Sequence, residues 1–125
     1  TILCDYSLTN EDIVHSARFC HEIGLFGFND FAPIGEEWVL RNKGYYGIPY
    51  EMLLPRGLKN VWAAGRHITE EFEAQMSTRN TVNCMVQGQA AGIAAALCAR
   101  GNLDSRSLPY ETLREKLLEA NVCLE

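Results

Sequence analysis

The sequence predicts an α/β fold, or an α+β fold, in which strands and helices are mixed. Three patterns support this prediction. Residues 60–65 form a short apolar run that is typical of a buried strand. Residues 46–54 alternate apolar side chains with others, which is the period of a strand with one buried face. Residues 80–99 carry the apolar and small side chains of one long helix.

The composition is that of a folded domain of ordinary size. The chain has 125 residues, of which 47% are hydrophobic and 22% are charged. Its formal net charge is −5 and it has no basic run, which argues against nucleic acid as the main partner. We expect one soluble domain with a small-molecule or protein partner.

The five cysteines do not form a metal motif. No pair is spaced as C-x-x-C, and no histidine lies at zinc-finger spacing, so we expect no metal site. Reduced, mostly buried thiols indicate a cytoplasmic protein. A redox dithiol stays open, because it requires two cysteines to meet in space. The chain begins without a signal peptide and without methionine, and we expect it to be cut from a longer one.

The first third of the sequence predicts one helix and one loop. Thr9 is a candidate N-cap, and Asp12 three residues later completes a weak capping box. A helix is expected over residues 10–21. Residues 24–35 are rich in glycine and aromatic residues and predict a loop. A short strand is expected over residues 38–40.

The middle of the sequence predicts two strands separated by a turn. Pro49 cannot donate a ladder hydrogen bond, so the strand over residues 46–54 should lie at an edge or be bulged there. Residues 55–57 predict the turn, and residues 60–65 the second strand. Residues 69–77 carry three glutamates and no apolar period, so they predict a loop or a frayed helix.

The long helix over residues 80–99 has two stripes. The larger apolar residues form one stripe: Val82, Met85, Val86, Ile93 and Leu97. The small residues form the other: Gly88, Gly92, Ala95, Ala96 and Ala99. Each glycine inside a helix costs about 1 kcal/mol relative to alanine. The two glycines therefore predict the close approach of a sheet or of another helix.

The end of the sequence predicts a second, shorter helix. Residues 100–102 end the long helix, which is expected to be too polar for a membrane because of three side chains: Asn83, Gln87 and Gln89. Ser107 and Pro109 open the last helix. Its apolar face is expected to hold Leu113, Leu117 and Leu118, and Asn121 is its candidate C-cap.

The order strand, Ala-Gly-Arg, polar loop and long helix predicts an anion site. A helix N-terminus presents unpaired N–H groups and a partial positive charge, here at residues 80–82. Such an end favours a phosphate, a carboxylate or an electron-rich ring oxygen. Gly65 has no side chain and lets a bulky ligand approach, while Arg66 and Arg79 can each neutralise an anion. The alternative is an ordinary crossover with surface arginines.

Several motifs of the second half carry a family resemblance. These are IPY, the LLP turn, NVWAAGR, a spaced EA, S-x-R, and C-M-x-x-G-Q-A-A-G-x-A-A-A. With them, residues 45–102 resemble the C-terminal part of the FAD-dependent oxidoreductases that are distantly related to fumarate reductase and succinate dehydrogenase flavoproteins. Residues 8–33 resemble the preceding segment more weakly.

The resemblance implies a division of the chain. Residues 57–125 would be the C-terminal part of a Rossmann-like FAD-binding domain, with residues 61–64 as its last strand. Residues 1–56 would belong to a substrate-side region with a helix and an edge strand. Gly88 and Gly92 would let the long helix press against the sheet of the FAD domain.

The resemblance also implies the site. Gly65 and Arg66 would lie near the diphosphate or ribityl chain of FAD, and Arg79 near the flavin or a substrate carboxylate. The start of the long helix would point toward the pyrimidine edge of the flavin ring and favour its reduced, negatively charged form, with four cofactor-binding residues: Asn80, Thr81, Val82 and Asn83. The catalytic candidates are His67 and Arg79.

One motif of that family is absent. The family binds the ADP half of FAD through an N-terminal G-x-G-x-x-G, which does not occur here. We therefore expect a C-terminal fragment whose partner is the N-terminal FAD-binding half of the same protein. Alone it should bind FAD weakly or not at all, and self-associate through its exposed apolar surface. The full enzyme would pass a hydride or electrons between a small-molecule substrate and FAD. The alternative is a non-catalytic interaction module or degenerate domain that keeps the fold without the cofactor.

Overall fold

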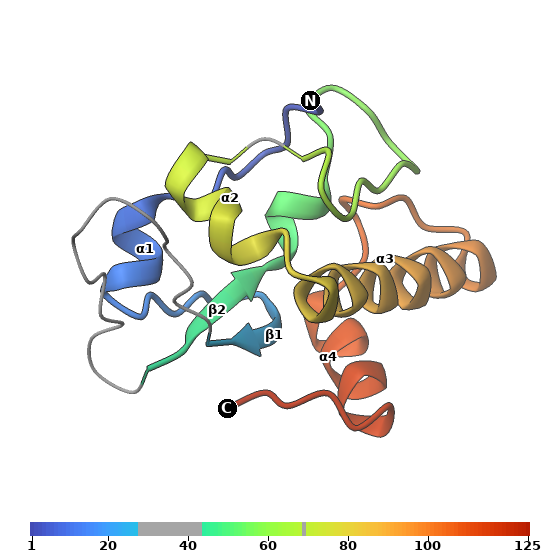
Figure 1. Ribbon diagram of the computed structural model, residues 1–125. Helices are drawn as coiled ribbons and strands as arrows, with labels where there is room; N and C mark the ends of the chain where they lie inside the picture. The colour runs from blue at the N-terminus through green and yellow to red at the C-terminus, as the bar shows by residue number, and fades with distance from the viewer. Residues whose placement is uncertain (28–43, 69) are drawn as a thin grey trace, which may run out of the picture.

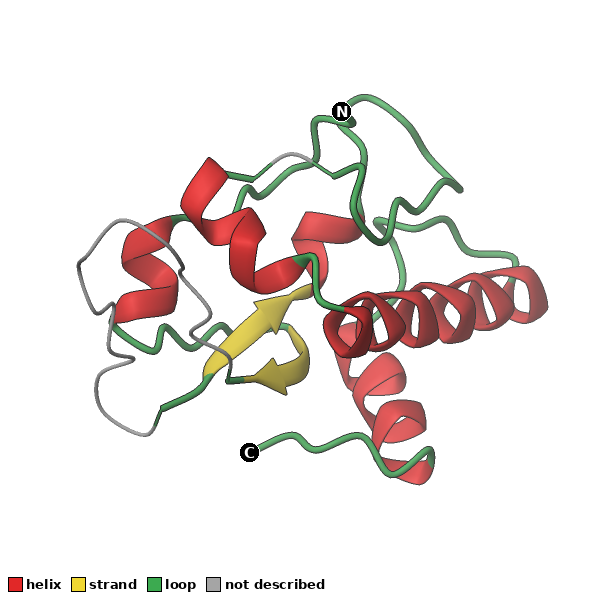
Figure 2. Ribbon diagram, viewed as in Figure 1, coloured by secondary structure: helices red, strands yellow, loops and turns green. Residues whose placement is uncertain are grey.

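The computed structural model describes residues 1–27, 44–68 and 70–125. Figures 1 and 2 show a small sheet that lies between two groups of helices. This mixture agrees with the predicted combination of strands and helices. In chain order the elements are α1 (Asn10–Val14), β1 (Glu22–Phe26), β2 (Tyr46–Pro49), the 3-10 helix η1 (Tyr50–Leu53), α2 (Phe72–Thr78), α3 (Thr81–Gly101) and α4 (Tyr110–Glu119).

The sheet consists of β1 and β2, which pair antiparallel. Phe26 lies opposite Tyr46, and the register is irregular between Glu22 and Gly24. Gly24 lies directly against α3, because a Cβ on it would be only 2.4 Å from Cγ1 of Val86. The missing side chain therefore lets α3 pack on the sheet.

Helix α1 begins as predicted but is shorter. The hydroxyl of Thr9 accepts the Asp12 N–H at 3.1 Å, and the Asp12 carboxylate accepts the Thr9 N–H at 2.9 Å, which completes the capping box. The helix ends at Val14 and does not reach residue 21, because Ser16 takes a left-handed φ of 56°. A residue in that conformation cannot continue a right-handed helix.

The loop predicted over residues 24–35 is wrong at its start. Residues 24–26 belong to β1, since they pair with β2. Glycine-rich and aromatic composition indicated a loop, but pairing with a distant segment decides a strand. Residues 28–43, with the predicted strand over residues 38–40, lie outside the described residues.

The strand predicted over residues 46–54 ends at Pro49, and η1 follows it. All four residues of β2 are buried, so the predicted alternation of buried and exposed side chains is not observed. The predicted turn after it is confirmed. Gly57 has a φ of 74° there, which favours glycine.

The strand predicted over residues 60–65 is wrong. This segment runs as a loop beside η1, where the Ala63 N–H donates to the Leu53 carbonyl at 2.9 Å. Ala63 is buried, but Val61 is 42% exposed. A strand needs a neighbour that is hydrogen-bonded to its backbone along its length, and within the described ranges this segment has one backbone–backbone hydrogen bond, to Leu53.

Helix α2 covers residues 72–77 of the predicted loop or frayed helix and extends to Thr78. Helix α3 confirms the predicted long helix, and Asn102 ends it with a left-handed φ of 51°. The larger apolar stripe faces the core only in part. Val86, Ile93 and Leu97 are half-buried and pack against the core, whereas Val82 and Met85 are 61% and 68% exposed. The buried residues of α3 are instead Asn83, Gln87, Ala90, Ala94 and Cys98.

The inner face of α3 is therefore polar near its start and small further along. Periodicity of apolar residues missed this, because the partners that satisfy buried amides come from other parts of the chain. The close approach expected at Gly88 and Gly92 is not made by the described residues, since nothing lies within 4 Å of a Cβ built on either glycine.

Among the described residues, α3 is the helix that is long and apolar enough to cross a membrane by length and composition. This differs from the expectation that its polar side chains exclude it. Core helices of soluble proteins meet the same criteria. Two of the three polar residues, Asn83 and Gln87, are buried inside the protein.

Helix α4 packs against α3 and against the sheet. Leu113 and Leu117 are fully buried, whereas the predicted core residue Leu118 is 40% exposed. The hydroxyl of Tyr110 donates to the Glu22 carbonyl of β1 at 2.6 Å. The C-cap is Ala120, one residue before the predicted Asn121, which follows it with a φ of 61°.

The N-terminal segment is held by the chain just before α4. The guanidinium of Arg106 pairs with the Asp5 carboxylate. It also donates to the carbonyls of Pro55 at 2.7 Å and Leu58 at 3.2 Å. Arg106 thus joins three segments that are far apart in the sequence.

The buried face of α4 gives the first prediction. Leu117→Ala should lower the free energy of unfolding by about 2–5 kcal/mol, because it removes buried methyl groups and leaves a cavity. Leu118→Ala, on the exposed side of the same turn, should change it by less than about 1 kcal/mol. Urea denaturation followed by circular dichroism compares the two, and equal losses would contradict the observed orientation of α4.

Candidate functional site

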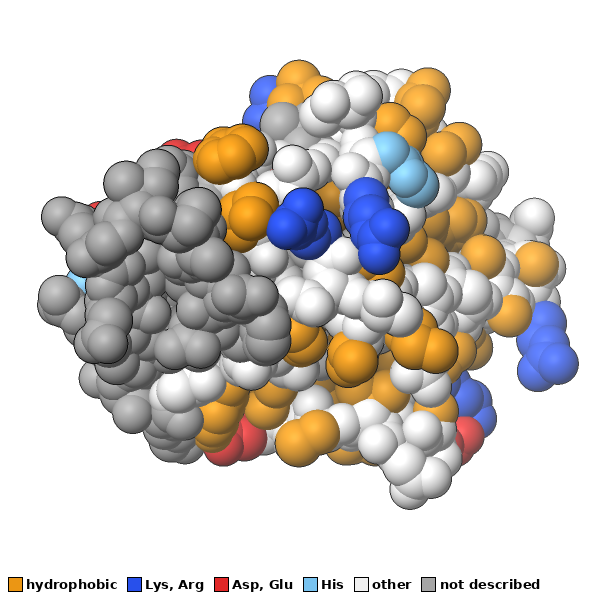
Figure 3. Space-filling view, viewed as in Figure 1, with side chains coloured by type: hydrophobic (Ala, Val, Ile, Leu, Met, Phe, Trp, Pro, Cys, Tyr) orange, Lys and Arg blue, Asp and Glu red, His pale blue; other side chains and the backbone are white. Residues whose placement is uncertain are grey.

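The predicted site residues come together at the junction of α2 and α3. Arg79 is the C-cap of α2, and Asn80 is the N-cap of α3. Arg66 reaches this junction, because its Nε donates to the Arg79 carbonyl at 3.0 Å. Figure 3 shows basic side chains and a histidine close together on one face, with hydrophobic side chains around them.

The first turn of α3 has free donors. Asn80 makes no side-chain capping bond to the helix, and its amide instead donates to the Ser77 carbonyl at 3.3 Å. The first-turn N–H groups find no acceptor among the described residues, and they belong to Thr81, Val82 and Asn83. Unpaired N–H groups at the positive end of a helix attract an anion or an electron-rich oxygen.

The two arginines add positive charge at the same place. Arg66 and Arg79 are both exposed, and neither forms an ion pair with a carboxylate in the described parts of the chain. The protein as a whole is acidic, with a net charge of −5. This junction is therefore a local cationic region, and guanidinium groups can bind phosphates or carboxylates through two parallel hydrogen bonds.

Gly65 forms the wall of the junction. Its φ of 95° is a conformation that L side chains rarely adopt. Among the described residues, a Cβ built there would meet the His67 ring alone, at 3.9 Å. The backbone of Gly65 is thus open to an incoming group on that side. The exposed His67 lies beside this opening, and its carbonyl accepts the Ile2 N–H at 2.6 Å.

Asn83 does not present its side chain to the surface. It is fully buried and belongs to a run of hydrogen bonds inside the protein, which we call the amide chain. The amide chain consists of the Gly65 N–H and the side chains of Gln87, Asn83, Tyr46 and Ser77. Only the backbone N–H of Asn83 is therefore available to a ligand.

Sequence reasoning missed Gln87, Tyr46 and Ser77. A usable pattern was present, because Asn83 and Gln87 are four residues apart and so share one helix face. That face continues along α3 with small residues, Ala90 and Ala94, which are typical of close packing. The pattern was used only to judge the polarity of the helix.

Glu70 is a second residue that sequence reasoning missed, because it was grouped with a solvated acidic loop. Its carboxylate accepts a hydrogen bond from the Thr78 hydroxyl. Burial raises the pKa of Glu70 from 4.5 to about 7, although the Thr78 bond opposes this change. Burial also raises the pKa of Tyr46, and the negative charge of Glu70 adds to that rise.

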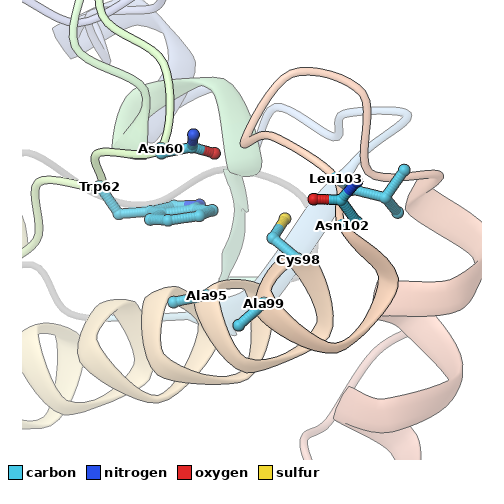
Figure 4. Close-up of a pocket in the computed structure, with 7 residues that line it drawn as sticks. All are labelled: Asn60, Trp62, Ala95, Cys98, Ala99, Asn102 and Leu103. Carbon is cyan, nitrogen blue, oxygen red and sulfur yellow. The ribbon is translucent and has the colours of Figure 1, made fainter.

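A pocket of about 360 Å³ lies away from this junction. Figure 4 shows the indole ring of Trp62 over Ala95 and Ala99 of α3, with Cys98 and Asn102 beside them. From Thr81 to Cys98 the axis of α3 rises roughly 25 Å. The pocket therefore belongs to the opposite end of the helix and does not include the predicted site residues.

The described residues hold no group of three or more histidine, cysteine, aspartate or glutamate side chains arranged for a metal ion. All five cysteines carry free thiols, of which Cys4 and Cys98 are buried. Burial raises the pKa of both of these thiols. They are therefore poor nucleophiles.

Glu70 predicts a pH effect on stability. Its pKa in the folded state is raised, so the folded state favours the protonated carboxyl. The stability that this proton provides is complete below the unfolded pKa near 4.5 and is lost as the pH rises through about 7. Glu70→Gln keeps a neutral group and should remove this loss.

Urea denaturation between about pH 5 and about pH 8 measures the effect. The native protein should lose more stability over this range than the Glu70→Gln variant. Glu115→Gln, at an exposed position of α4, is the matched control and should behave as the native protein does. If the native protein and Glu70→Gln show the same pH profile, the buried carboxyl is not protonated in the folded state.

Comparison with known proteins assigns the family. The family model described as FAD dependent oxidoreductase matches residues 1–117. No curated protein and no solved structure gives a significant match. The family match covers nearly the whole chain, including the junction of α2 and α3. The chain therefore belongs to the FAD-dependent oxidoreductase family.

Proposed function

We propose that this chain forms a flavin-facing surface of an oxidoreductase that transfers a hydride or an electron pair between a small-molecule substrate and FAD. One observation carries this proposal. Arg66 is hydrogen-bonded to Arg79, and both lie beside the uncapped start of α3. Family membership says which anionic, planar group such a junction would hold.

The residues at the junction fit FAD chemically. FAD carries a negatively charged diphosphate and a flat ring with carbonyl oxygens. The exposed guanidinium groups of Arg66 and Arg79 suit the diphosphate or a substrate carboxylate. The first-turn N–H groups of α3 suit ring oxygens. Gly65 has no side chain to block a bulky group.

Each residue then has a distinct role. FAD, when bound, supplies the acceptor or donor of the electron pair. Arg66 and Arg79 bind and orient negative charge. The start of α3, from Asn80 to Asn83, offers N–H groups and a positive helix end where negative charge increases during reduction. His67 is exposed beside Gly65 and is the candidate to donate or accept a proton at the substrate.

The proposal extends to the parts of the family fold. The Rossmann-like architecture of the FAD domain is part of this proposal, although residues 61–64 run as a loop in this chain. Residues 57–125 would belong to that domain and residues 1–56 to the substrate side. The distant relation to fumarate reductase and succinate dehydrogenase flavoproteins is part of the same proposal.

The competing function is a non-catalytic interaction module. In that case the exposed apolar side chains near the junction, which include Phe72, Val82 and Met85, would contact a protein partner. The absorption spectrum of the natural protein that carries this chain, purified with added FAD, separates the two functions. A flavin band that stays with the protein supports the oxidoreductase, and a folded, colourless protein supports the module.

The arginines give the sharper test. Arg66→Ala and Arg79→Ala should each weaken FAD binding by about tenfold, because each removes a charge-assisted contact. Arg100→Ala, which removes an exposed arginine at the other end of α3, is the matched control and should bind as the native protein does. Flavin fluorescence titration measures the three affinities. Equal affinities for all variants and the native protein would rule out the junction as the flavin surface.

A further inference from the structure

The amide chain runs from the Gly65 loop into the core. The Gly65 N–H donates to Gln87 Oε1 at 2.7 Å, and Gln87 Nε2 donates to Asn83 Oδ1 at 2.9 Å. Asn83 Nδ2 contacts the Tyr46 hydroxyl at 3.5 Å, which lies 2.7 Å from Ser77 Oγ. The side chains of Gln87, Asn83, Tyr46 and Ser77 are fully buried.

The orientation of the two side-chain amides follows from the Gly65 N–H, which is the first group of the amide chain. A backbone N–H can only donate, so Gln87 must turn its oxygen toward Gly65 and its nitrogen toward Asn83. Asn83 must then accept through its oxygen and donate through its nitrogen to Tyr46. The Tyr46 hydroxyl accepts from Asn83 and is also hydrogen-bonded to the Ser77 hydroxyl, where either oxygen can be the donor. Rotating either amide by 180° would place two donors or two acceptors face to face.

No polar atom of the amide chain is left without a partner. Within the described residues, the buried side-chain atoms without a hydrogen-bond partner are Asn10 Oδ1 and Ser105 Oγ, and neither belongs to the amide chain. A fully satisfied network of buried groups holds one arrangement, because each alternative leaves a buried group unpaired. Gly65 is the point where this fixed network meets the surface.

We propose that Gln87 is a positioning residue for the flavin surface. It holds the Gly65 N–H and so sets the place of the Gly65–Arg66 segment relative to the first turn of α3. The same helix that offers the free N–H groups thus also fixes the loop that brings Arg66 to them. This role rests on the function proposed above, and it acts through Gly65 without contact between Gln87 and the ligand.

Two variants of Gln87 test the role. Gln87→Met keeps the length of the side chain but leaves the Gly65 N–H and Asn83 Oδ1 without partners. Gln87→Glu replaces the amide with a carboxyl group. When protonated, this group can accept from Gly65 and donate to Asn83 as glutamine does. When ionised, it can no longer donate to Asn83. Gln89→Met and Gln89→Glu, at an exposed position of α3, are the matched controls.

The first readout needs no flavin. Hydrogen–deuterium exchange of the natural protein without FAD follows the backbone of residues 61–67. Gln87→Met should speed exchange of this segment by about tenfold, because the bond that protects the Gly65 N–H is lost. Gln89→Met should leave it unchanged. Unchanged exchange in Gln87→Met would overturn the positioning role whatever the flavin does.

The second readout is FAD affinity at two pH values. Gln87→Met should bind FAD about tenfold more weakly than the native protein at any pH. The FAD affinity of Gln87→Glu should match that of the native protein at about pH 5. It should fall by about tenfold at about pH 8, as the carboxyl of the variant ionises. A loss of packing alone would not recover at low pH, so this recovery shows that residue 87 must be neutral and donate to Asn83 to hold the network, while the exchange of residues 61–67 tests the bond to Gly65 itself.

The outcomes separate the two proposals. If Arg66→Ala and Arg79→Ala weaken binding but both Gln87 variants bind as the native protein does, the positioning role is wrong and the flavin surface stands. If FAD binds equally well to all of these variants, the flavin surface is wrong and the positioning role falls with it. Faster exchange at residues 61–67 together with pH-dependent recovery in Gln87→Glu supports both.

Discussion

The hydrogen bond from the Gly65 N–H to Gln87 Oε1 determines how the surrounding elements can pack. A buried hydrogen bond adds only about 1 kcal/mol net, but leaving its donor or acceptor unpaired costs about 1–3 kcal/mol. The requirement to satisfy these groups, more than their attraction, constrains the structure. Helix α3 must therefore keep its amides turned inward, toward Gly65 on one side and Tyr46 on the other.

The inward amides explain why apolar side chains at the start of α3 are exposed while polar ones are buried. With Asn83 and Gln87 inside, Val82 and Met85 have to lie outside, because they occupy other faces of the same turns. Further along, alanines on the inner face keep the helix close to the body of the protein. Gly24 of β1 also allows this close approach, because it has no side chain between the sheet and α3. The polar site at the start of α3 and the packing of its middle are thus two results of one orientation.

The parts of the fold that depend on residues close together in the sequence could be predicted from the sequence. The capping box of Thr9 and Asp12 and the long helix before Asn102 are local features, and both are confirmed. The strand over residues 60–65 was wrong, since a strand depends on a partner that local pattern does not reveal. The prediction of an apolar inner face at the start of α3 was wrong for the same reason, because its buried amides are satisfied by residues up to 37 positions away.

The site shows the same division. The resemblance implied that Gly65, Arg66, Arg79 and the start of α3 each lie near FAD, and the structure brings these residues together at one junction. Their flavin contacts stay a prediction. Glu70 was missed because it does not differ locally from an ordinary surface residue, and Gln87 because its spacing from Asn83 places the two on one helix face but does not show that this face is buried. Burial, which the whole fold creates, raises the pKa of Glu70 and fixes the orientation of the Gln87 amide.

The bridge between Asp5 and Arg106 has a consequence for the order in which the chain acquires its structure. The two residues are 101 positions apart, so closing this contact fixes a very long loop. The entropy of such closure must be lost before the contact stabilises anything, which slows folding relative to proteins with local contacts. During synthesis, Asp5 must wait until the chain has grown by 101 residues before Arg106 exists. Other bonds of the N-terminal segment go to residues 51–67 and close shorter loops, so the bridge to Arg106 is the contact of this segment with the longest wait.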